Sequence, residues 1–267
     1  MENFLNHNIG FCEYITGNRF IDICELIGAT FCKTDFIQEM RGLNIKILVT
    51  HNSDYHINER AYNHKPATVK KWFAQNKDIN SKSVISIPIG LENMTLRVST
   101  ASQAGRFSSE VKNALRKARI IRSLFEVGPK KDRLTYMNFN PVTYPTERLY
   151  IKQLFKNNSL VTCTSNLSLK QYYDDLASHK FVISPRGNGV DCHRTWEALY
   201  LKTIPIIRKA CYMEEFGELP ILFIDKWEDL NYIDLEGTYE QMISKEYNLE
   251  KMKISYWENE IRESVNE

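Results

Sequence analysis

The 267-residue sequence predicts an α/β protein whose strands form parallel sheets, and three features lead to this class. Short apolar runs that suit buried strands alternate along most of the chain with longer segments of helical spacing. The clearest unit is 181–208, which is typical of a strand, a turn, a helix and a second strand. Polar residues gather in the turn of this unit, where the carboxyl end of a parallel strand opens to ligands.

The remaining elements follow in order from their own patterns. Apolar runs predict strands over, in chain order, 45–50, 84–90, 134–137, 160–163, 181–184, 204–207 and 221–224. Helical spacing predicts helices over 68–75, 108–125, 168–178 and 192–201, further helices that begin near 145 and 227, and a helical tail from 248. Residues 20–24 fit either a strand or the start of a helix. Trp72 is expected on the first of these helices, and Ala118 and Arg122 on one side of the second.

The best candidate for a domain boundary is 128–132, which combines turn formers with charge. Two Rossmann-like halves, 1–128 and 129–267, are the simplest account of the strand and helix order. In such folds the last helix often crosses back to the first domain, and the tail from residue 248 could do so.

The composition is that of an ordinary globular protein, with 43% hydrophobic and 25% charged residues. Because 35 Lys and Arg nearly balance 33 Asp and Glu, the bulk charge predicts no nucleic-acid partner. One basic run, 112–122, is either the solvated face of a helix or a surface that attracts a diphosphate or an acidic acceptor. The six cysteines form no C-x-x-C pair, so no zinc or redox motif follows and free thiols are expected.

The first residues carry no basic segment followed by an apolar one, and no run approaches the roughly 20 apolar residues of a membrane span. The sequence therefore predicts a cytoplasmic protein without a signal peptide or an integral membrane segment.

The turn of the central unit gathers the polar residues that are best suited to a ligand. They are Arg186, Asn188, Asp191, His193, Arg194 and Glu197. The glycines Gly187 and Gly189 permit close backbone approach, and the start of the following helix favours anions. These residues predict a site for an anionic, hydroxyl-rich ligand.

The stretch PRGNGVDCHRTWEALYLKTIPII resembles the C-terminal signature of exostosin-like glycosyltransferases, a PRG … R-x-W/F-E-A-L … G-x-I-P-V pattern. The resemblance is tight over about thirty residues and looser from Lys46 to Trp227. It implies a GT-B fold, with two Rossmann-like domains facing each other across a cleft, and sugar transfer from a nucleotide-sugar, usually a UDP-sugar. Lys202 and Thr203 depart from the pattern, which often has a small residue or Gly there.

The chain is also shorter than animal exostosins and lacks their membrane anchor. Together with its richness in Lys, Asn and Ile, this favours a microbial or viral soluble member.

The resemblance implies that the second half binds the donor. Glu197 would accept bonds from the ribose hydroxyls, although composition alone permits a surface residue. Arg194, three residues earlier, could hold the diphosphate, form an i,i+3 salt bridge with Glu197, or do both. Arg186 is a second phosphate candidate or a solvated turn residue. Asp191 is either a helix N-cap or a ligand, and His193 is expected to bond the donor sugar or phosphate.

A second loop follows the strand 134–137 and is expected to face the donor phosphates. Its candidates are Asn138, Asn140, Thr146 and Arg148. Arg148 would supply positive charge to the leaving nucleoside diphosphate, or it is a helix-surface residue.

The first half is expected to bind the acceptor. Asp54 is the first candidate for the catalytic base and His51 the second, since both follow the best strand of this half. Asp54 could equally cap a turn. Glu92 is a third candidate base or an acceptor ligand. GT-B enzymes need no D-x-D metal motif, so no metal or other cofactor is expected, and the resemblance implies inversion.

The prediction is therefore a hexosyl- or pentosyltransferase acting on a glycan or other hydroxyl acceptor. One alternative is another nucleotide-using transferase or an epimerase, but no P-loop and no G-x-G-x-x-G motif is present. The other alternative is a catalytically inactive GT-B module that binds a glycan or a partner protein.

Overall fold

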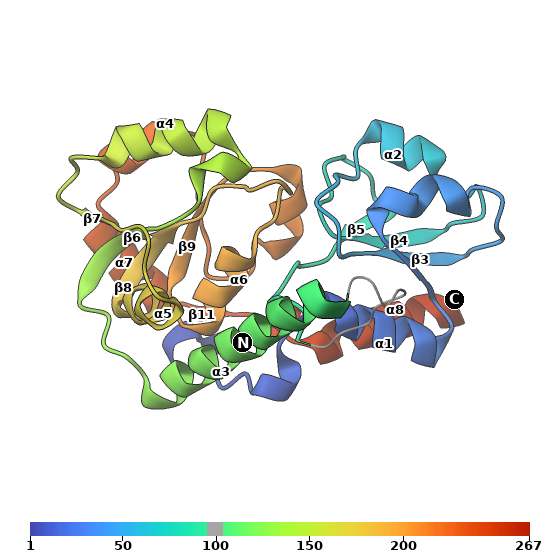
Figure 1. The fold of residues 1–267 in the computed structure, drawn as a ribbon, viewed down its shortest axis with the longest axis horizontal. Helices are drawn as coiled ribbons and strands as arrows, with labels where there is room; N and C mark the ends of the chain where they lie inside the picture. The colour runs from blue at the N-terminus through green and yellow to red at the C-terminus, as the bar shows by residue number, and fades with distance from the viewer. Residues whose placement is uncertain (95–103) are drawn as a thin grey trace.

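A computed structural model describes residues 1–94 and 104–267, without the side chains of 104–111 and 214 (Figure 1). The fold contains two parallel sheets, of order β2-β3-β4-β5 and β10-β9-β8-β6-β7, and a short antiparallel ladder, β1-β11. The predicted α/β class with parallel sheets is confirmed, and the sheets are consistent with Rossmann-like folds. No helix in the described part of the chain is both long and apolar enough to cross a membrane.

The strands are β1 (Glu2–Asn3), β2 (Thr30–Cys32), β3 (Ile47–Thr50), β4 (Lys71–Ala74), β5 (Val84–Ser86), β6 (Arg133–Met137), β7 (Val161–Cys163), β8 (His179–Ile183), β9 (Ile204–Arg208), β10 (Leu222–Ile224) and β11 (Glu246–Tyr247). The α-helices are α1 (Gly17–Ile27), α2 (Glu59–His64), α3 (Ala104–Val127), α4 (Pro145–Phe155), α5 (Leu169–Ser178), α6 (His193–Tyr200), α7 (Leu235–Ile243) and α8 (Ile254–Asn266). Short 3₁₀ segments include η3 (Thr34–Met40), η5 (Pro141–Thr143), η6 (Cys211–Phe216) and η7 (Trp227–Asn231). All the strands predicted in the second half are present, whereas the helix expected at 227 is only the 3₁₀ segment η7.

The helix expected over 68–75 is wrong, because Lys71–Ala74 forms strand β4 between β3 and β5. Trp72 lies on one face of the sheet with Leu48, and Phe73 lies on the other face in the larger core. A four-residue apolar run does not distinguish a strand from a helix by its period, and pairing with two neighbouring strands decided the outcome.

Residues 20–24, which fitted either a strand or a helix start, lie within α1. This helix ends at Gly28, whose φ of 77° places it in the left-handed region, and the Gly28 N–H donates to the Cys24 carbonyl. Glycine adopts this conformation without the steric cost that a side chain would add.

Helix α3 packs against α5 and α6, below the second sheet in Figure 1. Among its described side chains, Ala114, Ala118 and Ile121 are buried, at the spacing of one helix face. Arg122, expected on the same side as Ala118, is exposed and pairs with Glu126, so that assignment was wrong.

Helix α8 lies beside α1 and packs on β3 of the first sheet (Figure 1). Trp257 and Ile261 are buried there, and Lys71 of β4 donates to Ser264 and pairs with Glu267 at 2.7 Å. At the other end of the chain, β1 pairs with β11. The last helix thus contacts the first sheet, while the division into 1–128 and 129–267 stays a prediction.

We expect Ile261→Ala to lower the free energy of unfolding by about 2–5 kcal/mol, because it leaves a cavity between α8 and the first sheet. Arg262→Ala, on the exposed side of the same helix, removes only an i,i+4 ion pair and should cost about 0.5 kcal/mol or less. Denaturant titration of both variants measures the difference. Equal losses would contradict a packed role for this face of α8.

Candidate functional site

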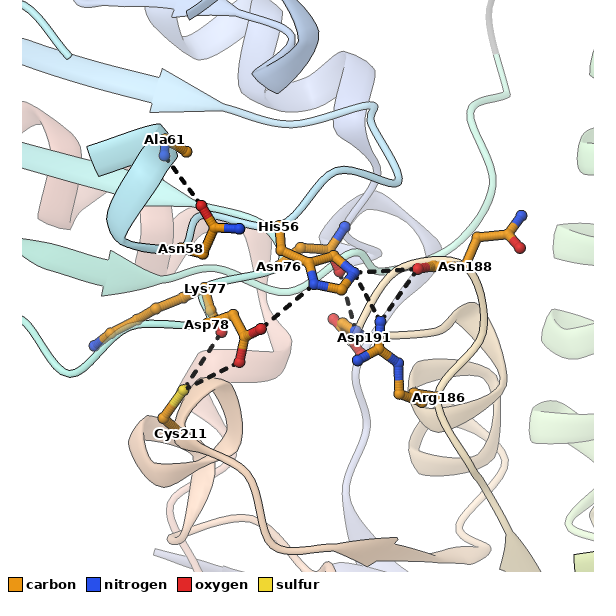
Figure 2. Close-up of polar contacts among 10 residues, drawn as sticks. All are labelled: His56, Asn58, Ala61, Asn76, Lys77, Asp78, Arg186, Asn188, Asp191 and Cys211. Atoms are coloured by element: carbon orange, nitrogen blue, oxygen red, sulfur yellow. Dashed lines mark hydrogen bonds and ion pairs between the residues drawn. The ribbon is translucent and has the colours of Figure 1, made fainter. Parts of the chain in front are cut away.

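Loops at the carboxyl ends of both sheets meet, and polar contacts join them (Figure 2). The loops after β3, β4 and β5 come from the first sheet, and the turn between β8 and α6 comes from the second. Asn188 Nδ2 of this turn donates to Asp54 Oδ2 at 3.2 Å, and His193 Nδ1 donates to the Gly90 carbonyl at 2.7 Å. The structure therefore brings the predicted acceptor-side and donor-side loops together.

Asp191 is buried where the two halves touch. Its carboxylate accepts hydrogen bonds from Ile89 N at 2.8 Å, from Cys192 N at 2.8 Å and from Trp196 Nε1 at 2.9 Å. Burial raises the pKa of Asp191 to about 6, although these three donors favour the ionised form. The N-cap of α6 is Cys192, so the N-cap alternative for Asp191 is wrong, while the ligand alternative stays a prediction. Its hydrogen-bond donors come from both halves, so Asp191 connects the two halves.

Asn76, which follows β4, fixes the same turn. Its side chain accepts from Asp191 N at 3.0 Å and donates to the Ser53 carbonyl at 2.8 Å. A Cβ on Gly189 would lie 2.7 Å from the Asn76 side chain, so the close approach requires glycine. Asn76 was not among the predicted site residues, because assigning 68–75 to a helix hid the strand end that it follows.

Arg148 is buried and holds the turn from the side of α4. It donates from Nε to the Arg186 carbonyl at 2.7 Å, from Nη1 to the Asn140 carbonyl at 2.8 Å, and from Nη2 to the Pro185 carbonyl at 3.2 Å. Burial and the nearby Arg194 charge lower the pKa of Arg148 to about 10. The helix-surface alternative is therefore wrong. Arg148 positions the turn and adds a buried positive charge.

Arg186 lies on this turn, and Arg194 lies in the first turn of the following helix α6. Arg194 Nε donates to the Asn138 carbonyl at 3.1 Å, and its guanidinium lies 5.5 Å from the Phe139 ring centroid. The Arg186 guanidinium lies 4.4 Å from the Tyr144 ring centroid, and its buried Nε has no hydrogen-bond partner among the residues that the structure describes.

The salt bridge considered between Arg194 and Glu197 is not formed. In the described part of the chain, none of Arg148, Arg186 and Arg194 pairs with a carboxylate, whereas Arg133 and Arg208 both do.

Glu197 is buried, so the surface alternative is wrong for this residue. Its oxygens accept from Tyr173 at 2.7 Å and from Tyr172 at 3.2 Å, and burial together with this carboxylate raises the pKa of both phenols. Lys117 of α3 pairs with Glu92 nearby. Burial lowers the pKa of Lys117, but Glu197 and Glu92 together raise it above the ordinary lysine value. Lys117 belongs to the basic run 112–122, so this run contacts Glu92 and contributes a positive charge near Glu197.

His51 is buried, and both of its ring nitrogens have partners. Nδ1 accepts from Asn52 N at 2.8 Å, and Nε2 donates to the Pro88 carbonyl at 3.0 Å. Burial lowers the pKa of His51 to about 4. This geometry leaves no ring nitrogen for an acceptor hydroxyl, whereas Asp54 is exposed and accepts a hydrogen bond from Asn188.

The remaining candidates after β6 differ in their surroundings. Asn138 Nδ2 donates to Tyr136 and Thr164 at 3.1 and 2.9 Å. Asn140 caps η5 by accepting from Val142 N at 3.0 Å, and Thr146 is exposed on the first turn of α4. Within the described ranges, no three His, Cys, Asp or Glu side chains form a group that could hold a metal ion.

We expect Asp191→Asn to lower the free energy of unfolding by about 1–3 kcal/mol at pH 7, because the amide NH₂ must face one of the three donors. The wild type should lose stability as the pH rises from about 4 to about 6. The unfolded carboxyl ionises near 3.8, whereas the folded one retains its proton to about 6. The variant lacks this dependence, so the stability difference should shrink across that range. Denaturant titrations from pH 4 to 8 measure it, and a constant difference would contradict the prediction.

Comparison with known families finds a match within the second half of the chain. Residues 145–267 match the family model of the RXYLT1 C-terminal domain, while no curated protein matches the chain. The matched segment begins at the first residue of α4 and includes Arg148, Arg186, Arg194 and Glu197. A microbial or viral source stays a prediction, because the match carries no information on origin. The match links the chain to a glycosyltransferase-related family through its C-terminal 123 residues.

Proposed function

We propose that this chain is a GT-B glycosyltransferase that transfers a sugar from a nucleotide-sugar, in particular a UDP-sugar, to a hydroxyl of a glycan or other acceptor. The observation that carries the proposal is a group of three arginines that have no carboxylate partner among the described residues: Arg148 on α4, Arg186 in the turn after β8 and Arg194 on α6. The Arg194 charge lowers the pKa of buried Arg148, so the two cations repel each other. A bound diphosphate would relieve this repulsion.

In this proposal Arg194 and the start of α6 bind the diphosphate. The N-cap residue Cys192 makes no side-chain cap bond, so the first N–H groups of the helix have no cap of that kind. A helix N-terminus favours an anion, and a guanidinium can bind it in a bidentate way. Arg148 contributes a buried positive charge next to the turn. Arg186 and His193 lie on the side of the turn that contacts the first half. This positive field is the basis for proposing metal-independent transfer.

Glu197 is proposed to bind the ribose. A carboxylate has about four lone-pair sites, and the two tyrosines occupy two of them. Asn138, Asn140 and Thr146 would border the donor from the loop after β6. The first half would bind the acceptor, with Asp54 and Glu92 on that side, and direct displacement would invert the anomeric centre.

The alternative of an inactive binding module also has an observation in its favour. Several donor-side groups are already engaged by the protein, since Arg186 donates to His56 and Glu197 accepts from two tyrosines. UDP release from a panel of UDP-sugars separates the two functions. The transferase should release UDP, whereas the inactive module should release none.

We expect Arg194→Ala to weaken UDP binding about 10- to 100-fold, as the loss of a charged hydrogen bond predicts. Glu197→Gln, which keeps the side-chain size, should also weaken it. Arg133→Ala is the matched control, because this arginine of the same half pairs with Asp175 on the surface. Calorimetric titration with UDP, with and without EDTA, measures the affinities. Unchanged binding in both site variants would refute this donor site, and loss of binding in EDTA would refute metal independence.

A further inference from the structure

His56, in the loop between β3 and α2, lies between groups of both halves (Figure 2). Its Nε2 is 2.7 Å from Arg186 Nη2 of the second half. Its Nδ1 is 3.4 Å from Asp78 Oδ2, which follows β4 of the first half. The His56 side chain is 25% exposed, so solvent and ligands can reach it, whereas His51 is buried with both nitrogens engaged.

These contacts determine which ring nitrogen carries the proton. A guanidinium can only donate, so Nε2 must offer its lone pair to Arg186. Nδ1 then carries the hydrogen and points to the Asp78 carboxylate. The Asn188 carbonyl is also 3.2 Å from Nε2, but a donor at Nε2 would face the Arg186 N–H and leave Nδ1 facing a carboxylate. The Nδ1–H form is therefore favoured, with a basic nitrogen directed at the second half.

The two loops that carry this pair are fixed to each other by backbone hydrogen bonds. Ile57 N donates to the Asn76 carbonyl, and Asp78 N donates to the Ile57 carbonyl, both at 2.9 Å. They form a parallel bridge between Ile57 and Lys77. The histidine and the aspartate are thus adjacent to a rigid connection, and their relative position does not depend on a flexible loop.

The other charged or titratable groups nearby come from both halves. Asp54, on the loop of His56, accepts from Asn188. The Cys211 thiol of η6 lies 3.9 Å from Asp78 Oδ1, and the Lys77 ammonium is paired with Glu215. Among the described charged groups, Arg186 is the one within hydrogen-bond distance of the basic nitrogen Nε2.

We infer that His56 is the general base that takes the proton of the acceptor hydroxyl, and that Asp78 is its positioning residue. The inference rests on the proposed glycosyl transfer. The acceptor O–H proton passes to Nε2 while the oxygen bonds to the anomeric carbon. The bond from that carbon to the diphosphate oxygen breaks, and its electron pair leaves with the nucleoside diphosphate. Asp78 stabilises the imidazolium that forms, as a carboxylate does in other histidine bases.

Arg186 gives this base a second property. The acceptor hydroxyl and Arg186 compete for the same lone pair, so the guanidinium must leave Nε2 before the base can act. A diphosphate bound at the turn offers Arg186 a stronger, charged acceptor. Donor binding would therefore uncover the base, which would disfavour proton abstraction before the donor is in place.

The test compares His56→Gln, Asp78→Asn and Asp54→Asn with the wild type, and uses His64→Gln on α2 as the matched control. UDP-glucose, UDP-galactose, UDP-xylose and UDP-N-acetylglucosamine are the donors, and p-nitrophenyl glycosides are the acceptors. We expect kcat to fall about 100- to 10,000-fold in His56→Gln, with UDP affinity unchanged, and to fall about 10-fold or more in Asp78→Asn. The rise of kcat/KM with pH should be lost in His56→Gln and kept in the control.

The inference is overturned if His56→Gln binds UDP and retains kcat and its pH dependence, or if these losses occur in Asp54→Asn instead. Should His56→Gln fail to fold, the pH dependence of kcat/KM in Asp78→Asn tests the inference instead. A changed dependence relative to the wild type supports it, and an unchanged one overturns it. A wild type that neither binds UDP nor releases it from any donor overturns the proposed function itself. These results are distinguishable, because UDP binding is measured separately from transfer.

Discussion

The contact between the two halves depends on the Asp191 carboxylate, which is buried between the loop after β5 and the start of α6. Its charge is removed from water, and three N–H donors compensate for that loss. One of these donors belongs to the first half and the other two to the second. Any movement that opens the halves at this point would leave a buried carboxylate without one of its partners, so the contact holds the turn between β8 and α6 in place.

The turn is held equally from its other side. Gly189 lies against Asn76, and Arg148 donates to the carbonyls of Pro185 and Arg186. Because these contacts use backbone atoms of the turn, the turn presents Arg186 and Arg194 from a fixed frame. The positive charge of the second half therefore faces the acidic and imidazole groups of the first. The proposed transfer between an anionic donor and a hydroxyl acceptor would use this arrangement.

Contacts made by both ends of the chain stabilise the same arrangement. Helix α8 follows the last strands of the second half in the chain yet packs on α1 and β3, and β1 at the start of the chain pairs with β11. Each half thus contains chain from the opposite end of the sequence. Any rearrangement between the halves would have to keep these connections intact. This favours local side-chain changes, such as the proposed release of His56 by Arg186, over wide separation of the sheets.

The sequence by itself determined the α/β class, the strands of the second half and the polar turn at 185–194, because these depend on local apolar runs and on Pro and Gly turn chemistry. It also singled out Glu197 and the three arginines, through residue type and a resemblance to a known signature. It failed at Lys71–Ala74, since a short apolar run is a strand only when neighbouring strands pair with it.

Contacts between distant segments were decided only by the tertiary structure. The sequence did not reveal that Asp191 and Asn76 join the halves, that His51 is enclosed, or that His56 meets both Asp78 and Arg186. Asp78 is 22 residues from His56 and Arg186 is 130 residues from it, and no local pattern relates such positions. The physical reason is that hydrogen bonding and burial between loops depend on how the two sheets are placed, and packing of the whole chain sets that placement.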